Sequence, residues 1–500
     1  MASQAETAAL PERFSTGVAG LDTILGGGFF RGGIYVVSGR PGAGKTIFAN
    51  QACFQHAARG ERALYVTLLA ENHARMLTQM RSLSFFRQES VGTSIHFISA
   101  FDALAKEGLD GLLRVVQKTA RDLGATLLVL DGMVTAENLA RNNVDYKRFI
   151  HELQTWCGLM ECSVILLTST PSDPAIQPEH SMVEGIIELC RQGHRMRSVR
   201  LLSVTKFRGG PVLEGEHSYV IDQNGLDVFP RLESLAMHPP VARDHGARAG
   251  TGVAALDRVL GGGFPVGSAS LVLGPTGCGK TMLGMQFLEA GAAHGENGLL
   301  FTFFENAVDL VERQGSVWRR LRGHLQEGRI HVCWQPPTER ILDAMGATLV
   351  DTVVRQRARR VFMDGLAGFR EALPNPERLS AFFAALTQML ADQGVTTLVS
   401  EETRDLLPRE AQIPTTGVSA TFQNILFLRH VEDRGHLTRV VSVVKMRDSP
   451  HEHGTYRVTV GGDGLDLHGA LPDPAPGGRA ARTTRATPRR ARVRAKARKR

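Results

Sequence analysis

The chain has 500 residues, of which 43% are hydrophobic and 22% charged, and its formal net charge is +8. This length is enough for two domains of ordinary size, and the composition agrees with a soluble protein. No apolar run approaches the roughly 20 residues that a membrane-spanning helix needs. Residues 1–10 lack the basic and then apolar pattern of a signal peptide. We therefore expect a cytoplasmic protein with no membrane partner.

After an N-terminal extension, residues 1–13, the first half contains a phosphate-binding signature between an apolar strand, 34–38, and a helix, 48–59. Glycines in the G-x-x-x-x-G-K-[ST] pattern let backbone N–H groups point at phosphate oxygens. Lys45 is expected to reach the β- and γ-phosphates, and the Thr46 hydroxyl to bind magnesium. The sequence therefore predicts a site for ATP and Mg²⁺ made of Gly39, Arg40, Pro41, Gly42, Ala43, Gly44, Lys45 and Thr46.

Two later strands of this half end in acids. The apolar run 126–131 ends in Asp131, the Walker B pattern, and this carboxylate would hold magnesium through its water shell. The run 64–72 ends in Glu71 and an asparagine, so Glu71 is the candidate for positioning the attacking water. The alternatives are an ordinary turn-forming aspartate and a solvated glutamate near a helix start.

The second half repeats this arrangement with an offset of 235 residues, from the opening at 250–257 to the signature loop. The matching metal ligands are Thr281 and Asp364, and the matching water-positioning acid is Glu305. A signature that recurs in the same context is not a chance glycine turn. The second predicted loop consists of Gly274, Pro275, Thr276, Gly277, Cys278, Gly279, Lys280 and Thr281.

Strands and helices alternate after each loop, which predicts two tandem α/β domains, each a mainly parallel sheet flanked by helices. The expected boundaries are 14–236 for the first domain, 237–247 for a linker, 248–470 for the second domain and 471–500 for a disordered basic tail. Residues 479–500 contain eleven basic residues and no acid, so the rest of the chain is slightly negative. This tail would either bind nucleic acid by charge or remain a solvated end. Both alternatives stay open because no aromatic residue that could stack on bases lies among the arginines.

From residue 14 to about residue 467, the chain resembles the KaiC-like branch of RecA-type ATPases, typified by a circadian clock ATPase and kinase. The resemblance rests on the repeated opening, both loops, both Walker B strands and a Lys-x-Arg motif near each domain end. It implies two RecA-like P-loop NTPase domains and a homo-oligomeric ring, a hexamer, in which the motif reaches the γ-phosphate held by a neighbouring subunit. The motif residues are Lys206, Arg208, Lys445 and Arg447. The alternative is that these basic residues lie on a solvated strand face and have no role in catalysis.

The same resemblance implies a signalling ATPase with serine/threonine autophosphorylation in its second domain and a signalling protein partner that the sequence does not identify. Ser419 matches the serine of the family's Ser-Thr pair, and Ala420 replaces the threonine. Family members often have two adjacent acids where this chain has Phe304-Glu305, which puts the extra activating carboxylate in doubt. Two other functions stay open: a DNA-dependent recombination motor and a nucleotide-gated scaffold.

Overall fold

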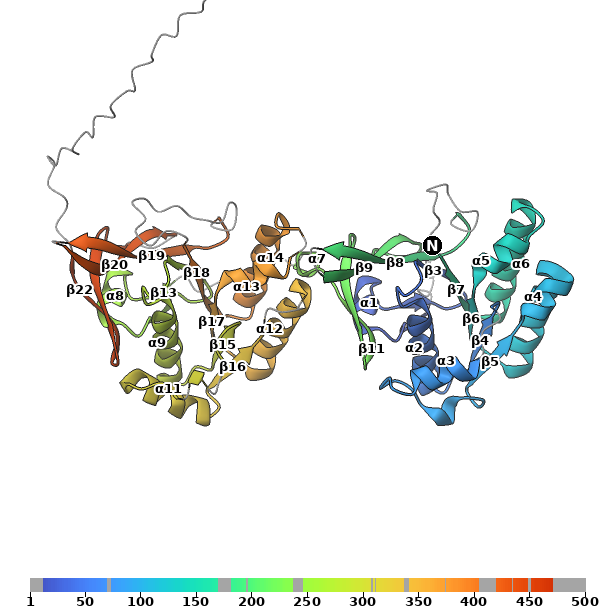
Figure 1. Cartoon of the computed structure of the whole chain (residues 1–500), viewed down its shortest axis with the longest axis horizontal. Coiled ribbons are helices and arrows are strands. Elements are labelled where there is room, and N and C mark those ends of the chain that lie inside the picture. Colours follow the sequence, from blue (N-terminus) through green and yellow to red (C-terminus); the bar gives the residue numbers. More distant parts are fainter. Residues whose placement is uncertain are drawn as a thin grey trace, which may run out of the picture.

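Each half of the chain forms one nine-stranded sheet with helices on both faces, and the two lobes lie side by side (Figure 1). This is a computed structural model. It describes residues 12–69, 73–169, 181–194, 197–236, 246–306, 309–310, 312–336, 341–373, 375–403, 420–433, 435–447 and 451–470. The prediction of two tandem α/β domains is confirmed, and the domain boundaries stay a prediction.

The first half builds its sheet in the order β11-β10-β9-β8-β3-β7-β6-β4-β5. The run from β8 to β5 is parallel, and β9, β10 and β11 add antiparallel strands at one edge. The elements are β1 (Arg13–Phe14), α1 (Ala19–Ile24), β2 (Phe29–Phe30), β3 (Ile34–Gly39), α2 (Lys45–Ala58), β4 (Ala63–Thr67), α3 (His73–Met80), the 3₁₀ helix η1 (Gln88–Ser90), β5 (Ile95–Ser99), α4 (Phe101–Leu123), β6 (Leu127–Asp131), α5 (Met133–Leu139), α6 (Asn143–Met160), β7 (Ser163–Thr168), β8 (Gly185–His194), β9 (Arg197–Phe207), β10 (His217–Asp222), β11 (Gly225–Phe229) and α7 (Leu232–Leu235).

The second half has the same strand order, written here from the other edge of the sheet: β16-β15-β17-β18-β14-β19-β20-β21-β22. Its parallel and antiparallel parts correspond strand by strand to those of the first half. The elements are β12 (Arg248–Ala249), α8 (Ala254–Val259), β13 (Phe264–Pro265), β14 (Ala269–Gly274), α9 (Lys280–Ala293), β15 (Gly298–Thr302), α11 (Ser316–Gln326), β16 (Ile330–Trp334), α12 (Leu342–Gln356), β17 (Arg360–Asp364), α13 (Leu366–Glu371), α14 (Arg378–Asp392), β18 (Thr396–Glu402), β19 (Asn424–Asp433), β20 (His436–Met446), β21 (Thr455–Gly461) and β22 (Gly464–Ala470).

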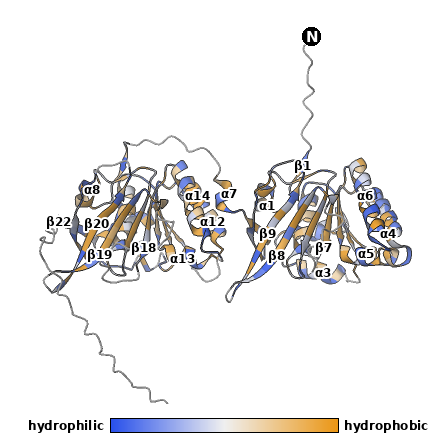
Figure 2. Ribbon diagram, turned by 90° about the horizontal axis from the view of Figure 1, so that it is seen from above, coloured by the Kyte–Doolittle hydropathy of each residue, from blue (hydrophilic) through white to orange (hydrophobic). Residues whose placement is uncertain are grey.

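Central strands in both sheets are mostly apolar because both faces are covered. Every residue of β3 and of β14 is buried, the pattern expected for parallel strands between two helical layers. In Figure 2 orange residues are concentrated on the sheets, and the outer helices α4 and α6 carry much of the blue. Each domain therefore has a core on either side of its sheet. No helix in the described ranges is both long and apolar enough to cross a bilayer.

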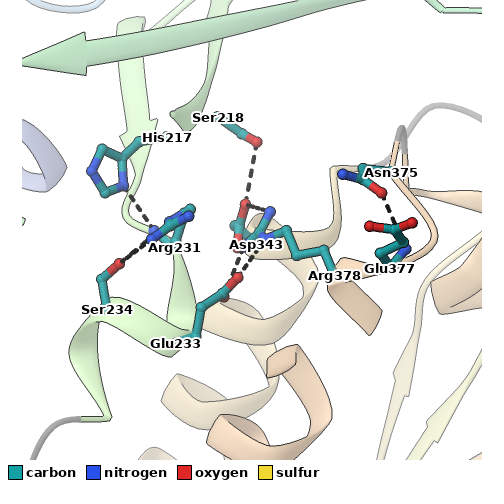
Figure 3. Close-up of polar contacts among 9 residues, drawn as sticks. All are labelled: His217, Ser218, Arg231, Glu233, Ser234, Asp343, Asn375, Glu377 and Arg378. Carbon is teal, nitrogen blue, oxygen red and sulfur yellow. Dashed lines mark hydrogen bonds and ion pairs between the residues drawn. The ribbon is translucent and has the colours of Figure 1, made fainter. Parts of the chain in front are cut away.

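The two lobes meet at the short helix α7, which packs against α14 and α12 (Figure 1). Leu232 is 2% exposed and belongs to a core of the second domain. Beside it, Arg378 donates hydrogen bonds to Glu233 at 2.9 Å and to Asp343 at 2.9 Å. Asp343 also accepts a hydrogen bond from Ser218 of β10 at 3.2 Å (Figure 3). A polar network thus joins the sheet of the first domain to two helices of the second.

Candidate functional site

Both signature loops run from the end of a buried strand into the first turn of a helix, β3 to α2 and β14 to α9. The residue before each helix is a glycine with left-handed backbone, Gly44 at φ 107° and Gly279 at φ 110°. A side chain at Gly44 would also collide with Ile221. The N–H groups of the first helical turn and the positive end of each helix dipole face the loop. Neither glycine has a side chain that could cap these N–H groups, so they stay available to a phosphate.

The loop lysines fold back over their own loops. Lys45 Nζ lies 2.5 Å from the Gly39 carbonyl, and Lys280 Nζ lies 2.8 Å from the Gly274 carbonyl. Burial lowers the pKa of Lys45, and the nearby Asp131 carboxylate acts in the opposite direction. Each ammonium group is therefore held at its loop, where it can bind the phosphates of a nucleotide.

The Walker B aspartates reach the loops because of the strand order. In each domain one strand, β7 or β18, lies between the loop strand and the Walker B strand, β6 or β17. Thr281 Oγ1 donates to Asp364 Oδ2 at 3.0 Å, which brings the two predicted metal ligands of the second site together. A hydroxyl and a carboxylate are the oxygen ligands that Mg²⁺ prefers, directly or through water.

Each aspartate also has a hydrogen-bond donor that the sequence reasoning missed. The Tyr65 hydroxyl donates to Asp131 Oδ2 at 2.6 Å, and Ser400 Oγ donates to Asp364 Oδ1 at 2.6 Å. Tyr65 comes from β4, and Ser400 comes from β18, so the two sites orient their aspartates from opposite neighbouring strands. The sequence gives no local signal for either contact.

The first loop opens into a cavity of ≈ 500 Å³. This is the size of the pockets that bind small-molecule ligands. Its lining brings together residues from the loop, from the Walker B strand and from β7, β9 and β10. They include Lys45, Thr46, Asp131, Thr168, Arg200 and Ile221.

The two candidate water-positioning acids differ in what can be said of them. Glu71 lies outside the described residues. Glu305 follows β15, the strand whose last residue, Thr302, pairs with Asp364 at the end of the Walker B strand. Its carboxylate forms an ion pair with Arg313 through Oε1, while Oε2 is buried and has no hydrogen-bond partner among the residues that the structure describes. A buried carboxylate oxygen of this kind is able to accept a hydrogen bond from water.

The Lys-x-Arg motifs do not lie at the loop ends of the strands in their own domains. Lys206 pairs with Ile186 on β8, and Ile186 pairs with Val36 on β3. Val36 is three residues, about 10 Å, before the start of the loop. In the second domain Lys445 pairs with Ile425, and its Nζ donates to the Phe422 carbonyl at 2.6 Å.

A β-bulge comes directly before the lysine of each motif. Bulges redirect side chains at the edges of functional sites. Arg208 and Arg447 lie just beyond the strand ends and are exposed, and Arg208 donates to the Ser181 carbonyl at 3.0 Å. Burial lowers the pKa of Lys206 and of Lys445, and the neighbouring arginine adds to this effect. The candidate phosphorylation residue Ser419 lies outside the described residues.

Two loops of this geometry, each at the end of a parallel strand and each beside a strand-terminal aspartate, define a nucleotide-binding protein with tandem P-loop domains. The family model described as "ATPase: KaiC" matches residues 14–233 and 249–470. The chain belongs to this KaiC ATPase family, and both of its repeats are KaiC domains.

Curated relatives are similar along nearly the whole chain. The circadian clock protein KaiC3 of Synechocystis sp. is 26% identical over 477 residues, which covers 91% of this chain and 92% of the relative. The circadian clock oscillator protein KaiC of Picosynechococcus sp. is 25% identical over 470 residues, covering 91% and 89%. That of Thermostichus vulcanus is 26% identical over 477 residues, covering 92% and 90%. The similarity to these relatives therefore extends over both repeats of this chain.

Proposed function

We propose that this chain is a signalling ATPase that binds and hydrolyses ATP with Mg²⁺ at both P-loop sites. The observation that supports this most strongly is the position of Thr281 beside Asp364, with Lys280 at the same loop. The equivalent residues of the first domain line one cavity. Both repeats therefore retain the groups that hold phosphates and the carboxylate that holds a metal.

The residues present fit Mg²⁺. Thr46 and Thr281 would bind it through their hydroxyls, and Asp131 and Asp364 through its water shell. When bound, Mg²⁺ would neutralise charge on the β- and γ-phosphates. The loop N–H groups and lysines would hold the phosphates in line, and Glu305 would orient the attacking water in the second site. Glu71 would do the same in the first.

We further propose that each site is completed by a neighbouring subunit in a ring. The Lys-x-Arg residues lie toward the end of the sheet opposite to their own loop, so they are poorly placed to reach a nucleotide held by the same domain. Two cations from an adjacent subunit would stabilise the charge on the transferring phosphoryl group, as arginine fingers do. The resemblance to the KaiC family favours a hexamer.

Single replacements of the loop lysines test the ATPase proposal. Lys45→Ala and Lys280→Ala should each remove turnover at one site, and the double variant should have no ATPase activity above background. If the double variant keeps the activity of the parent, the proposed function is wrong. If one single variant already abolishes all turnover, the other site is a scaffold site that binds nucleotide without hydrolysis.

Autophosphorylation in the second domain is part of the proposal by family resemblance. Incubation with ATP and Mg²⁺ followed by intact mass measurement and phosphosite mapping should find phosphate on Ser419. Ser419→Ala should remove it, and Lys280→Ala should prevent it by emptying the second site. Absence of any added phosphate would leave a plain ATPase.

Nucleic-acid binding by residues 479–500 is the remaining alternative from the sequence. A DNA motor should hydrolyse ATP faster when single-stranded DNA is added, and the increase should fade with rising salt. Deletion of residues 479–500 is the matched control, because it removes eleven basic residues and no acid. Turnover that does not respond to DNA excludes the motor.

A further inference from the structure

Strand β10 makes a direct contact with the first phosphate loop. The Tyr219 hydroxyl donates a hydrogen bond to the Ala43 carbonyl at 2.6 Å, and both residues are buried. Ala43 lies between Gly42 and Gly44, the two left-handed glycines of the loop. Burial raises the pKa of Tyr219 to about 12, so the hydroxyl keeps its proton and remains a donor at neutral pH.

The same strand touches the second domain through its other face. Successive strand residues point to opposite faces. Accordingly, Ile221 is on the same side as Tyr219 and packs over Gly44, whereas Ser218 donates to Asp343 at the start of α12 (Figure 3). One short strand therefore contacts the phosphate loop with one face and the neighbouring domain with the other.

We propose that Tyr219 is a positioning residue that holds the first phosphate loop in its binding conformation, and that Ser218 links the state of this loop to the second domain. The inference rests on ATP binding at the first site, which belongs to the proposed function. The inference assigns a part in ATP binding to Tyr219, a residue outside the phosphate-loop motif.

The geometry of the peptide bond gives the reason for the first part. The Ala43 carbonyl and the Gly44 N–H belong to one planar unit and point in opposite directions. A donor that fixes the carbonyl therefore also fixes the N–H that faces the phosphates. Without the hydroxyl, the carbonyl would be left buried and unpaired, and the loop would need to be ordered when ATP binds.

The second domain provides a comparison within the chain. Val458 pairs with Leu467 in the same register in which Tyr219 pairs with Val228. Val460 packs on Gly279 as Ile221 packs on Gly44. The apolar contact is thus present in both repeats, but valine has no hydroxyl, so within the described part of the chain the contact of a tyrosine hydroxyl with the loop is found in the first repeat.

The second part follows from the network around Asp343. This carboxylate is buried and accepts hydrogen bonds from Ser218 and from Arg378, the first residue of α14. A change in the first loop that moves β10 would therefore alter the hydrogen bonds at the starts of α12 and α14. Packed side chains and hydrogen-bond networks of this kind carry coupling between distant sites.

The test of Tyr219 uses the full chain with Lys280→Ala, so that only the first site binds ATP. Tyr219→Phe should weaken ATP binding about fivefold and raise KM similarly, while kcat changes less than twofold, because the hydroxyl touches no reacting atom. Tyr456→Phe is the matched control: Tyr456 lies on the equivalent strand β21, its hydroxyl donates to Glu452 at 2.8 Å, and its loss should leave KM unchanged. An unchanged KM in Tyr219→Phe overturns the positioning role.

The link to the second domain is tested by hydrogen exchange in the same Lys280→Ala chain. Addition of ATP and Mg²⁺ should slow amide exchange in residues 341–346 and 378–382, and Ser218→Ala should abolish that slowing. Equal slowing with and without Ser218 overturns the link. Lys45→Ala separates the two proposals: if it does not reduce ATP binding to this chain, the proposed function fails, and if it does while Tyr219→Phe has no effect, only this inference fails.

Discussion

Replacement of Arg378 by methionine should strongly destabilise the contact between the two domains. The Arg378 side chain is 19% exposed, and its guanidinium pairs with Asp343, whose side chain is 0% exposed, and with Glu233, whose side chain is 17% exposed. Removal of one partner from a buried pair costs about 3–5 kcal/mol. Because Glu233 retains some access to water, we expect about 3 kcal/mol, which lowers the Tm of a domain of this size by about 6–12 °C.

Thermal unfolding followed by circular dichroism measures this effect. The control is Arg355→Met on α12, since Arg355 pairs with Asp351 at 2.8 Å but both side chains are 62% exposed. Such surface pairs contribute about 0.5 kcal/mol or less, so the control should shift Tm by no more than about 2 °C. Equal shifts for the two variants would refute the reasoning, because they would show that the buried network contributes no more than a surface pair.

Three further predictions concern the first domain. Tyr65→Phe removes the hydrogen-bond donor to Asp131. In a Lys280→Ala chain it should raise the Mg²⁺ concentration for half-maximal ATPase activity about tenfold, as expected for a residue that orients a metal ligand. An unchanged Mg²⁺ requirement would contradict this. Burial lowers the pKa of His56 to about 4, so the unfolded chain takes up the proton first as pH falls from about 6.5 to 4. Up to about 3 kcal/mol of stability should be lost in that window, and urea unfolding should show His56→Gln to be much less pH-dependent there. Gly44→Ala should abolish ATP binding at the first site, measured by equilibrium dialysis, because the side chain would meet Ile221 in a left-handed backbone.

The parts of the site carried by short motifs were predictable from the sequence. The two loops, the strands that end in Asp131 and Asp364, and the helices that follow the loops lie where the patterns place them. Each depends on residues close together in the chain, where glycine geometry, apolar runs and a terminal carboxylate act locally. The antiparallel edge that carries the Lys-x-Arg motifs is instead a property of strand order.

The contacts that orient these motifs were not predictable. Tyr65 lies 66 residues from Asp131 and Tyr219 lies 176 residues from Ala43 in the sequence, and both contacts depend on which strands become neighbours and in which register. Leu232 also illustrates this: it precedes the linker, yet its side chain is buried in a core of the second domain. An apolar residue in a short segment gives no local sign of which domain will bury it.

Mixing two inactive variants tests the proposed trans-completed sites most directly. One chain carries Lys45→Ala and Lys280→Ala, so it binds no ATP but keeps both Lys-x-Arg motifs. The other carries Lys206→Ala, Arg208→Ala, Lys445→Ala and Arg447→Ala, so it binds ATP but supplies no cations. We predict that each is inactive alone and that co-assembled mixtures recover ATPase activity, since a loop of one chain meets the motif of its neighbour. Mixtures that stay inactive although the two chains co-assemble would contradict the account.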